Sequence, residues 1–152
     1  MSFYKIIKLI MKKVKTETKS QVIKKLDRVF SKYIRLKYSD KNWICECISC
    51  WKKIHWKEAH NCHWISRWNL QFRFDEENCR PGCPACNTYR PEFHIREFTI
   101  KQIERLWKEK VDEMRRQAKE VYKIWIVELR EKLEYYKQKV KQLEKEKGLS
   151  IK

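Results

Sequence analysis

Glycine and proline are scarce in this chain, which has two glycines and three prolines among its 152 residues. Because these residues mark most turns and loops, their scarcity predicts long helices around a short irregular centre. No run of about 18 apolar residues is present, so no transmembrane helix is expected. Residues 1–14 have neither a continuous apolar core nor a small-residue cleavage site. A secretory signal peptide is therefore not expected, and the predicted location is the cytoplasm.

Acidic residues are also in short supply, and the formal net charge is +17. Residues 1–41 carry 13 Lys/Arg against 3 Asp/Glu, residues 42–100 carry 8 against 7, and residues 101–152 carry 16 against 10. Two basic arms around a central segment predict a large anionic partner, whose phosphate backbone the arms could hold on either side. The N-terminal arm favours nucleic acid or an anionic surface, whereas the mixed charges of residues 101–147 fit a solvated helix equally well.

Four of the seven cysteines form two CxxC pairs, Cys47–Cys50 and Cys83–Cys86. Each pair places two thiolates on one tight turn, and two such turns complete a closed tetrahedral shell around Zn²⁺. We therefore predict a structural zinc site that supplies folding free energy to a segment too small to bury much core. Cys45 offers another ligand, although the CxxC spacing favours Cys47, and Cys62 and Cys79 are expected to be packing residues. This pattern fits a reducing compartment better than a disulfide scaffold.

Periodic apolar residues predict a helix near 20–37, with Ser20 as its N-cap. Residues 43–47 and 51–56 are expected to be short strands around the first CxxC pair, and residues 75–86 a loop.

A second helical region is predicted to begin at Thr99, because Gln102 three residues later completes a capping box. Apolar residues at steps of three and four then predict one long amphipathic helix, or two helices with a tight joint. Its apolar face could cover the central segment, pair with the N-terminal helix or dimerise. The fold class is thus α+β and mostly helical, with regions at 1–41, 42–98 and 99–152.

A second, open metal site is suggested by polar residues placed between and just after the CxxC pairs, namely His60, His63, Asn78 and Asn87. Hydrolysis of a phosphodiester needs a base to activate water and a cation to stabilise the developing charge. A histidine that is neutral near pH 7 can accept the proton, and Mg²⁺ accepts a site with few protein ligands. This combination predicts a nuclease.

The segment 19–105 resembles the NinG (Rap) recombination proteins of lambda-like phages, through DRVFSKYIRLKYSD, CISC, HWKEAHNCHWISR and RFDEENCRPGCPACN. That family is associated with structure-selective cleavage of branched DNA, including Holliday junctions. The central segment is also similar to the zinc-stapled His-Me (HNH) nucleases of the endonuclease VII type, in which two CxxC knuckles bracket a ββα-metal site. The resemblance implies that residues 42–98 form such a module.

The resemblance also implies a role for each polar residue. His63 matches the general base, Asn78 matches the asparagine that braces the loop carrying the base, and Arg67 matches an arginine assigned to phosphate contact. His60 stands where the family has a metal-binding aspartate and, with Asn87, is the implied ligand of a catalytic Mg²⁺ or Mn²⁺. Imidazole at position 60 favours Mn²⁺, Zn²⁺ or Ni²⁺ over Mg²⁺.

The predicted function is metal-dependent cleavage of branched or single-stranded DNA recombination intermediates, such as Holliday junctions and flaps. A homodimer is expected, because a junction must be cut symmetrically in two strands. One or two of Trp51, Trp64 and Trp68 could stack on an unpaired base at a branch point. The alternative is a catalytically weak or inactive zinc-containing DNA-binding recombination accessory protein. A third interpretation is a coiled-coil scaffold whose basic arms bind RNA.

Overall fold

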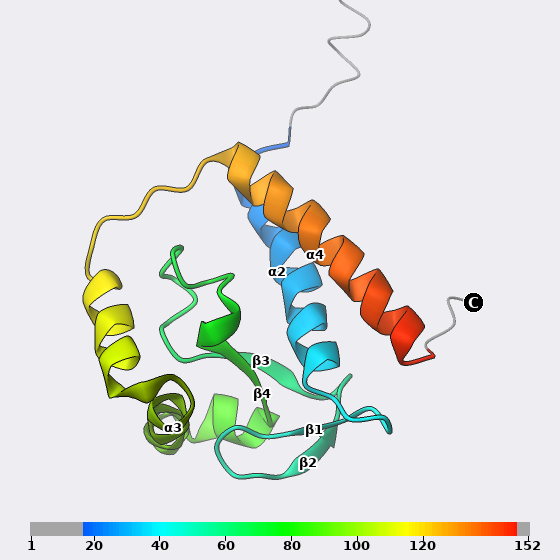
Figure 1. Ribbon diagram of the computed structural model, residues 1–152, viewed down its shortest axis with the longest axis vertical. Coiled ribbons are helices and arrows are strands. Elements are labelled where there is room, and N and C mark those ends of the chain that lie inside the picture. The colour runs from blue at the N-terminus through cyan, green and yellow to red at the C-terminus, as the bar shows by residue number, and fades with distance from the viewer. Residues whose placement is uncertain (1–16, 149–152) are drawn as a thin grey trace, which may run out of the picture.

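The computed structural model describes residues 17–148, so the first part of the basic N-terminal arm, residues 1–16, lies outside the described residues. The described chain is mostly helical and contains two small antiparallel sheets (Figure 1). Its α-helices are α2 (Lys19–Lys37), α3 (Pro91–Gln117) and α4 (Ile126–Glu146). This confirms the expectation of a mostly helical α+β chain. None of the helices within residues 17–148 is long and apolar enough to cross a membrane.

Helix α2 begins one residue before the predicted start, and its N-cap is Thr18, so the prediction of Ser20 is wrong. The Thr18 hydroxyl accepts a hydrogen bond from the Gln21 backbone at 3.3 Å, and the Gln21 side chain accepts one from the Thr18 backbone at 2.8 Å. These reciprocal bonds form a capping box two residues upstream of Ser20. The buried face of α2 includes Leu26 and Phe30 and packs in one apolar cluster with residues of α4.

The C-terminal region departs from its prediction. Helix α3 begins at Pro91, well before Thr99, so the capping box at Thr99 is wrong. Proline suits the first turn of a helix because its missing N–H would have no partner there. The Thr99 hydroxyl instead donates to the Ile95 carbonyl at 2.7 Å, inside the helix. The boundary placed between residues 98 and 99 therefore falls within α3.

Helices α3 and α4 are separate and are not joined tightly. Residues 118–125 form no helix before α4 begins, and α3 itself bends at Trp107, where φ is 66° and ψ is 156° (Figure 1). Helix α4 lies beside α2, as Figure 1 shows, which confirms the pairing of part of the C-terminal apolar face with the N-terminal helix. Helix α3 covers the central segment through Phe98, Val111 and Met114.

The two sheets are hairpins. The first pairs β1 (Ile44–Glu46) with β2 (Lys53–His55), close to the predicted strands, and the second pairs β3 (His60–His63) with β4 (Cys79–Gly82). The expectation of a loop over 75–86 is wrong, because β4 lies within it. Proline and glycine in Cys79–Gly82 conceal a strand from propensity rules. Tertiary contacts supply the signal instead, since β4 is fully buried and the Pro81 carbonyl accepts from the Ile48 N–H at 3.0 Å.

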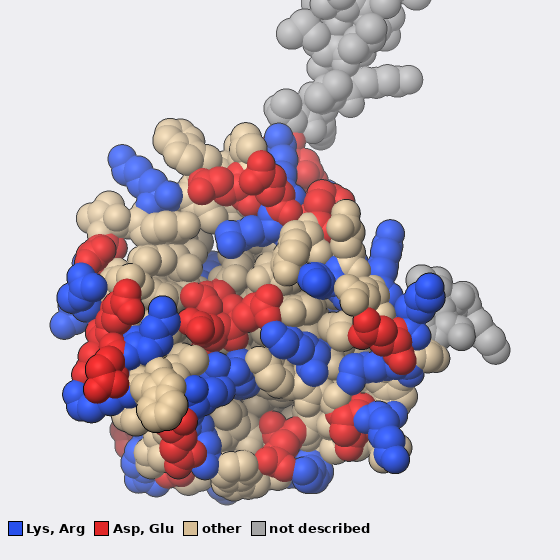
Figure 2. Space-filling model, in the orientation of Figure 1, with Lys and Arg blue, Asp and Glu red and all other residues tan. Residues whose placement is uncertain are grey.

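Exposed charges of both signs are interspersed on the face seen in Figure 2. Many are paired within a helix, as Lys108 is with Asp112 at 2.6 Å and Lys110 with Glu113 at 3.8 Å. Such exposed pairs contribute little to stability. They support the interpretation of the mixed charges on α3 as a solvated surface.

Candidate functional site

The four cysteines of the CxxC pairs lie together. Their sulfur atoms are all within 4.8 Å of one another, and the Cys50 and Cys83 sulfurs are 3.7 Å apart. Four thiolates bound to one Zn²⁺ at about 2.3 Å have sulfurs about 3.8 Å apart in a tetrahedron. The cluster fits these dimensions, so it could hold a structural metal such as zinc.

Local backbone geometry brings the cysteines to this point. Cys47 and Cys50 lie in the turn between β1 and β2, which the Trp51 N–H closes on the Cys47 carbonyl at 3.0 Å. Cys83 follows β4, and its sulfur accepts the Cys86 N–H at 3.4 Å. The four-cysteine cluster thus connects the ends of both hairpins, each of which has strands of only three or four residues.

The other three cysteines lie outside this cluster and are buried, as packing residues are. Burial raises the pKa of Cys45 to about 11, and the Cys45 sulfur contacts the Arg35 carbonyl at 3.2 Å. Burial also raises the pKa of Cys62 and of Cys79 above the ordinary value of 9.0. Their positions outside the four-cysteine cluster, together with their burial, fit the expected packing role of Cys62 and Cys79.

The β3 strand places the two histidines on opposite faces. Side chains alternate along a strand, so His60 shares a face with Cys62, and His63 shares the other with Asn61. The Asn87 side-chain amide donates to His60 Nδ1 at 3.0 Å. The structure thus brings together His60 and Asn87, the two implied metal ligands, and separates both of them from the implied base.

His63 has the protonation state that a general base requires. Its Nε2 lies 2.9 Å from the Arg73 carbonyl oxygen, which only accepts hydrogen bonds, so Nε2 carries the proton and Nδ1 keeps the lone pair. Burial lowers the pKa of His63 below its ordinary value of 6.5, and the positive charge of Arg67 lowers it further. The bond to Arg73 and the charge of Asp27 oppose this shift. The ring is therefore neutral at pH 7 and free to accept a proton.

Asn78 is fully buried and holds the loop between β3 and β4. Its side-chain oxygen accepts from the Ile65 N–H at 2.7 Å, and its amide donates to the carbonyls of Ile65 and Phe72 at 2.9 and 3.0 Å. These three bonds span the loop that follows His63. They are the contacts expected of a residue that braces this loop.

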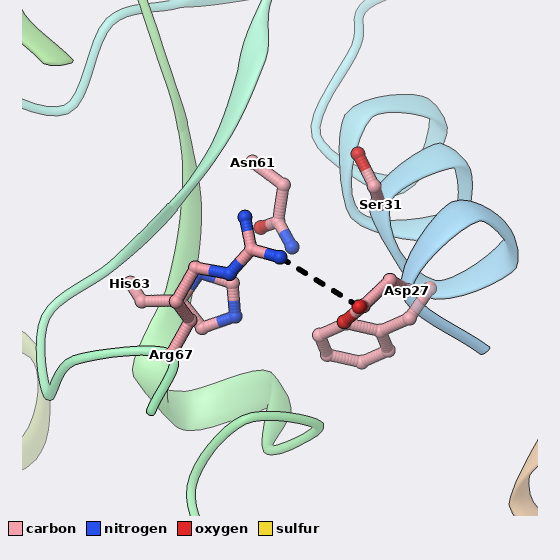
Figure 3. Close-up of a pocket in the computed structure, with 6 residues that line it drawn as sticks. Asp27, Ser31, Asn61, His63 and Arg67 are labelled. Carbon is pink, nitrogen blue, oxygen red and sulfur yellow. Dashed lines mark ion pairs between the residues drawn. The ribbon is translucent and has the colours of Figure 1, made fainter. Parts of the chain in front are cut away.

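His63 lines a surface pocket of about 110 Å³ between β3 and α2 (Figure 3). The lining residues are Asp27, Phe30, Ser31, Asn61, His63 and Arg67. Arg67 is exposed, and its guanidinium lies 3.7 Å from the Asp27 carboxylate, the ion pair drawn in Figure 3. The Asn61 side-chain oxygen is buried and has no hydrogen-bond partner among the described residues.

The charge around the pocket favours an anion. The Asp27 carboxylate binds the Arg73 guanidinium at 2.6 and 2.9 Å and also faces Arg67. Because the buried Arg73 already neutralises the Asp27 carboxylate, the exposed Arg67 guanidinium is available to bind phosphate oxygens. A pocket of this size and sign can accept a phosphate group next to a neutral histidine.

Asp27, Ser31 and Asn61 are site residues that were not predicted from the sequence. Asp27 and Ser31 are four residues apart, so both lie on one side of α2, beside the buried Phe30. A signal was present, because Asp27 is one of only three acids among residues 1–41 and lies in the segment DRVFSKYIRLKYSD. The segment's contact with β3 is a tertiary feature that the sequence does not display.

No curated protein and no solved structure matches the chain. A family model described as bacteriophage lambda NinG protein matches residues 5–146, which is most of its length. The match includes all four cysteines of the cluster and every residue of the pocket. This chain therefore belongs to the NinG family.

Proposed function

We propose that this protein is a metal-dependent DNA endonuclease that hydrolyses phosphodiesters in branched or single-stranded recombination intermediates. The observation that carries the proposal is the geometry of His63, whose Nε2–H is held by the Arg73 carbonyl and whose ring lines, with Arg67, a pocket large enough for a phosphate group. The antiparallel β3 and β4 strands followed by α3 have the strand–strand–helix order of a ββα-metal module.

In the proposed reaction, His63 Nδ1 accepts a proton from water as the water oxygen attacks the phosphorus atom. The bond between phosphorus and the leaving oxygen breaks, and that oxygen takes a proton from solvent. Arg67 stabilises the charge that develops on the phosphate oxygens. Asn78 holds the loop in place, so that Arg67 and His63 act on the same phosphate.

The proposed divalent cation, Mg²⁺ or Mn²⁺, would supply further charge stabilisation. His60 and Asn87 are close enough to share an ion, but such an ion would lie on the opposite face of β3 from His63. The pair does not fit the role of holding a cation against a phosphate in the His63 pocket. The reaction steps above therefore involve only the pocket residues.

This separation of His60 and Asn87 from His63 is the observation that favours the second candidate, a DNA-binding accessory protein with little or no catalysis. A cleavage assay distinguishes the two candidate functions. The protein is incubated with junction, flap, single-stranded and duplex DNA in Mg²⁺ or Mn²⁺. We expect cleavage of the branched or single-stranded substrates. Binding without cleavage under every metal condition would establish the accessory function instead.

Trp68 is the tryptophan best placed to stack on an unpaired base. It is 83% exposed and is next to Arg67 in the chain, whereas Trp64 is buried and donates to the Thr99 hydroxyl at 2.9 Å. Trp51 is already in contact with Lys101, whose ammonium lies 4.2 Å from its ring centre. Stacking of a base on an aromatic ring contributes about 1–3 kcal/mol.

We expect Trp68→Ala to weaken binding to single-stranded or branched DNA by about 5- to 150-fold, which corresponds to the loss of this stacking energy. Binding to duplex DNA should weaken much less. Fluorescence anisotropy with matched oligonucleotides measures both affinities. Trp107→Ala is the matched control, since Trp107 is also exposed but lies on α3. An equal loss for duplex and branched DNA would rule out base stacking by Trp68.

The proposal includes a homodimer, because two symmetric cuts need two sites. Two exposed apolar residues in the segment just before α4, Val121 and Trp125, offer a surface for self-association. We expect light scattering to give twice the mass of one chain, and the double variant Val121→Glu with Trp125→Glu to give the mass of one chain. A monomer at concentrations where the protein cuts junctions would contradict this prediction.

A further inference from the structure

Arg73 joins helix α2 to the loop between β3 and β4. Its side chain is only 10% exposed, and its Nε and Nη2 atoms donate to the two carboxylate oxygens of Asp27 at 2.9 and 2.6 Å. Two parallel hydrogen bonds fix the orientation of the guanidinium as well as its position. A buried guanidinium requires such a partner, because an unpaired charge in this environment is strongly unfavourable.

The backbone of the same residue orients His63. The Arg73 carbonyl accepts the His63 Nε2–H at 2.9 Å, and the Arg73 N–H donates to the Asn69 carbonyl at 2.9 Å. Arg73 Nη1 also donates to the Arg67 carbonyl at 3.2 Å. The residue that Asp27 anchors therefore sets the position of the ring at His63 and of the turn that carries Arg67.

We propose that Asp27 is a positioning residue for His63 and acts through Arg73. The inference rests on the proposed function only in calling His63 a base, since the contacts from Asp27 to Arg73 and from Arg73 to His63 hold without it. A histidine base needs its lone pair on the nitrogen that faces the substrate. A hydrogen-bond partner on the other ring nitrogen ensures this, because it fixes the tautomer and the ring plane. Helix α2, part of the basic N-terminal arm, is then a component of the site.

Loss of the Asp27 charge is expected to leave α2 in place. Leu26 and Phe30 on the same helix are buried to 0% and 1% exposure in the main apolar cluster, which includes Leu133 and Tyr136 of α4. These contacts do not involve Asp27. The effect of Asp27→Asn should therefore be concentrated on Arg73, which loses its partner and moves toward solvent together with its carbonyl.

The test combines an NMR measurement with cleavage kinetics on full-length protein. In the unaltered protein the His63 Nε2–H proton, assigned by its absence in His63→Ala, should be visible because the Arg73 carbonyl protects it from exchange. In Asp27→Asn we expect this signal to be lost and kcat to fall about 10- to 100-fold with little change in KM. Asp27→Glu should recover part of both. Asp112→Asn, which removes the same charge from an exposed ion pair, should change neither.

A protected His63 proton in Asp27→Asn would overturn the inference, whether or not the protein cuts DNA. If neither the unaltered protein nor any variant cuts DNA, the proposed function fails. The NMR result still decides the role of Asp27. If Asp27→Asn does not fold, the double variant Asp27→Asn with Arg73→Gln leaves no buried charge unpaired and is measured in its place. Retention of the proton signal in that double variant would likewise refute the inference.

Discussion

Replacement of Cys83 with serine is expected to remove the bound metal and to abolish cooperative unfolding of the protein. The four sulfurs of the cluster connect two hairpins whose strands have three or four residues, too few to be stable alone. Binding of a structural zinc contributes about 10–16 kcal/mol at neutral pH, which exceeds the net stability of most small domains. We expect about one zinc per chain in the unaltered protein, by elemental analysis, and a sharp thermal transition by circular dichroism.

Cys45→Ser is the matched control for this prediction. Cys45 is as deeply buried as Cys47 and only two residues away, but it lies outside the cluster. The variant should retain its zinc and its cooperative transition. A zinc-free Cys83→Ser protein that unfolds with an unchanged transition would show that the cluster does not stabilise the fold. Loss of zinc in Cys45→Ser would indicate that Cys45 is a metal ligand.

The features predictable from the sequence are those encoded by local spacing. The CxxC pairs predict the cluster because two thiolates on each turn need only one further contact between the turns. The apolar period of α2 predicts its length to within one residue, since its buried face repeats along the helix. Pro91 is a signal for the start of α3, but the capping pattern at Thr99 also predicts a helix start and is eight residues too late.

The features that could not be predicted depend on contacts between distant segments. Strand β4 contains Pro81 and Gly82 and is stabilised by pairing and burial. A Cβ at position 82 would lie 2.5 Å from the Cys62 sulfur across the hairpin, so a larger residue there would displace that buried side chain. Without this pairing, the residues from His60 to His63 show no strand pattern, and the sequence cannot reveal that His60 and His63 face opposite ways.

His63→Ala is expected to reduce the rate of DNA cleavage by about 10²- to 10⁴-fold, the usual contribution of a general base. Binding of DNA and content of zinc should be unchanged, because His63 is neither in the cysteine cluster nor positively charged at neutral pH. Single-turnover cleavage of a labelled junction measures the chemical step. Equal rates for His63→Ala and the unaltered protein would refute the proposal that His63 is the base of a nuclease.

Two other histidine variants sharpen this experiment. His55→Ala alters a half-buried ring on β2 and should leave cleavage unchanged. His60→Ala tests the geometry of β3, since His60 lies on the face opposite His63 and next to Asn87. If the pocket residues perform the reaction as proposed, His60→Ala should cut far faster than His63→Ala. Equal losses in the two variants would mean that both faces of the strand act on one phosphate.

The pH dependence of cleavage provides an independent test of His63 as the base. The base must be neutral to accept a proton, and burial lowers the pKa of His63 below the ordinary 6.5. The value of kcat/KM should therefore be constant around pH 7. It should fall only as the pH drops through that lowered pKa. The nearby charge of Arg67 also lowers the pKa of His63, so Arg67→Gln should move the acid limb of the profile toward higher pH. An acid limb that stays in place in Arg67→Gln, or one centred above 6.5 in the unaltered protein, would assign the base to another residue.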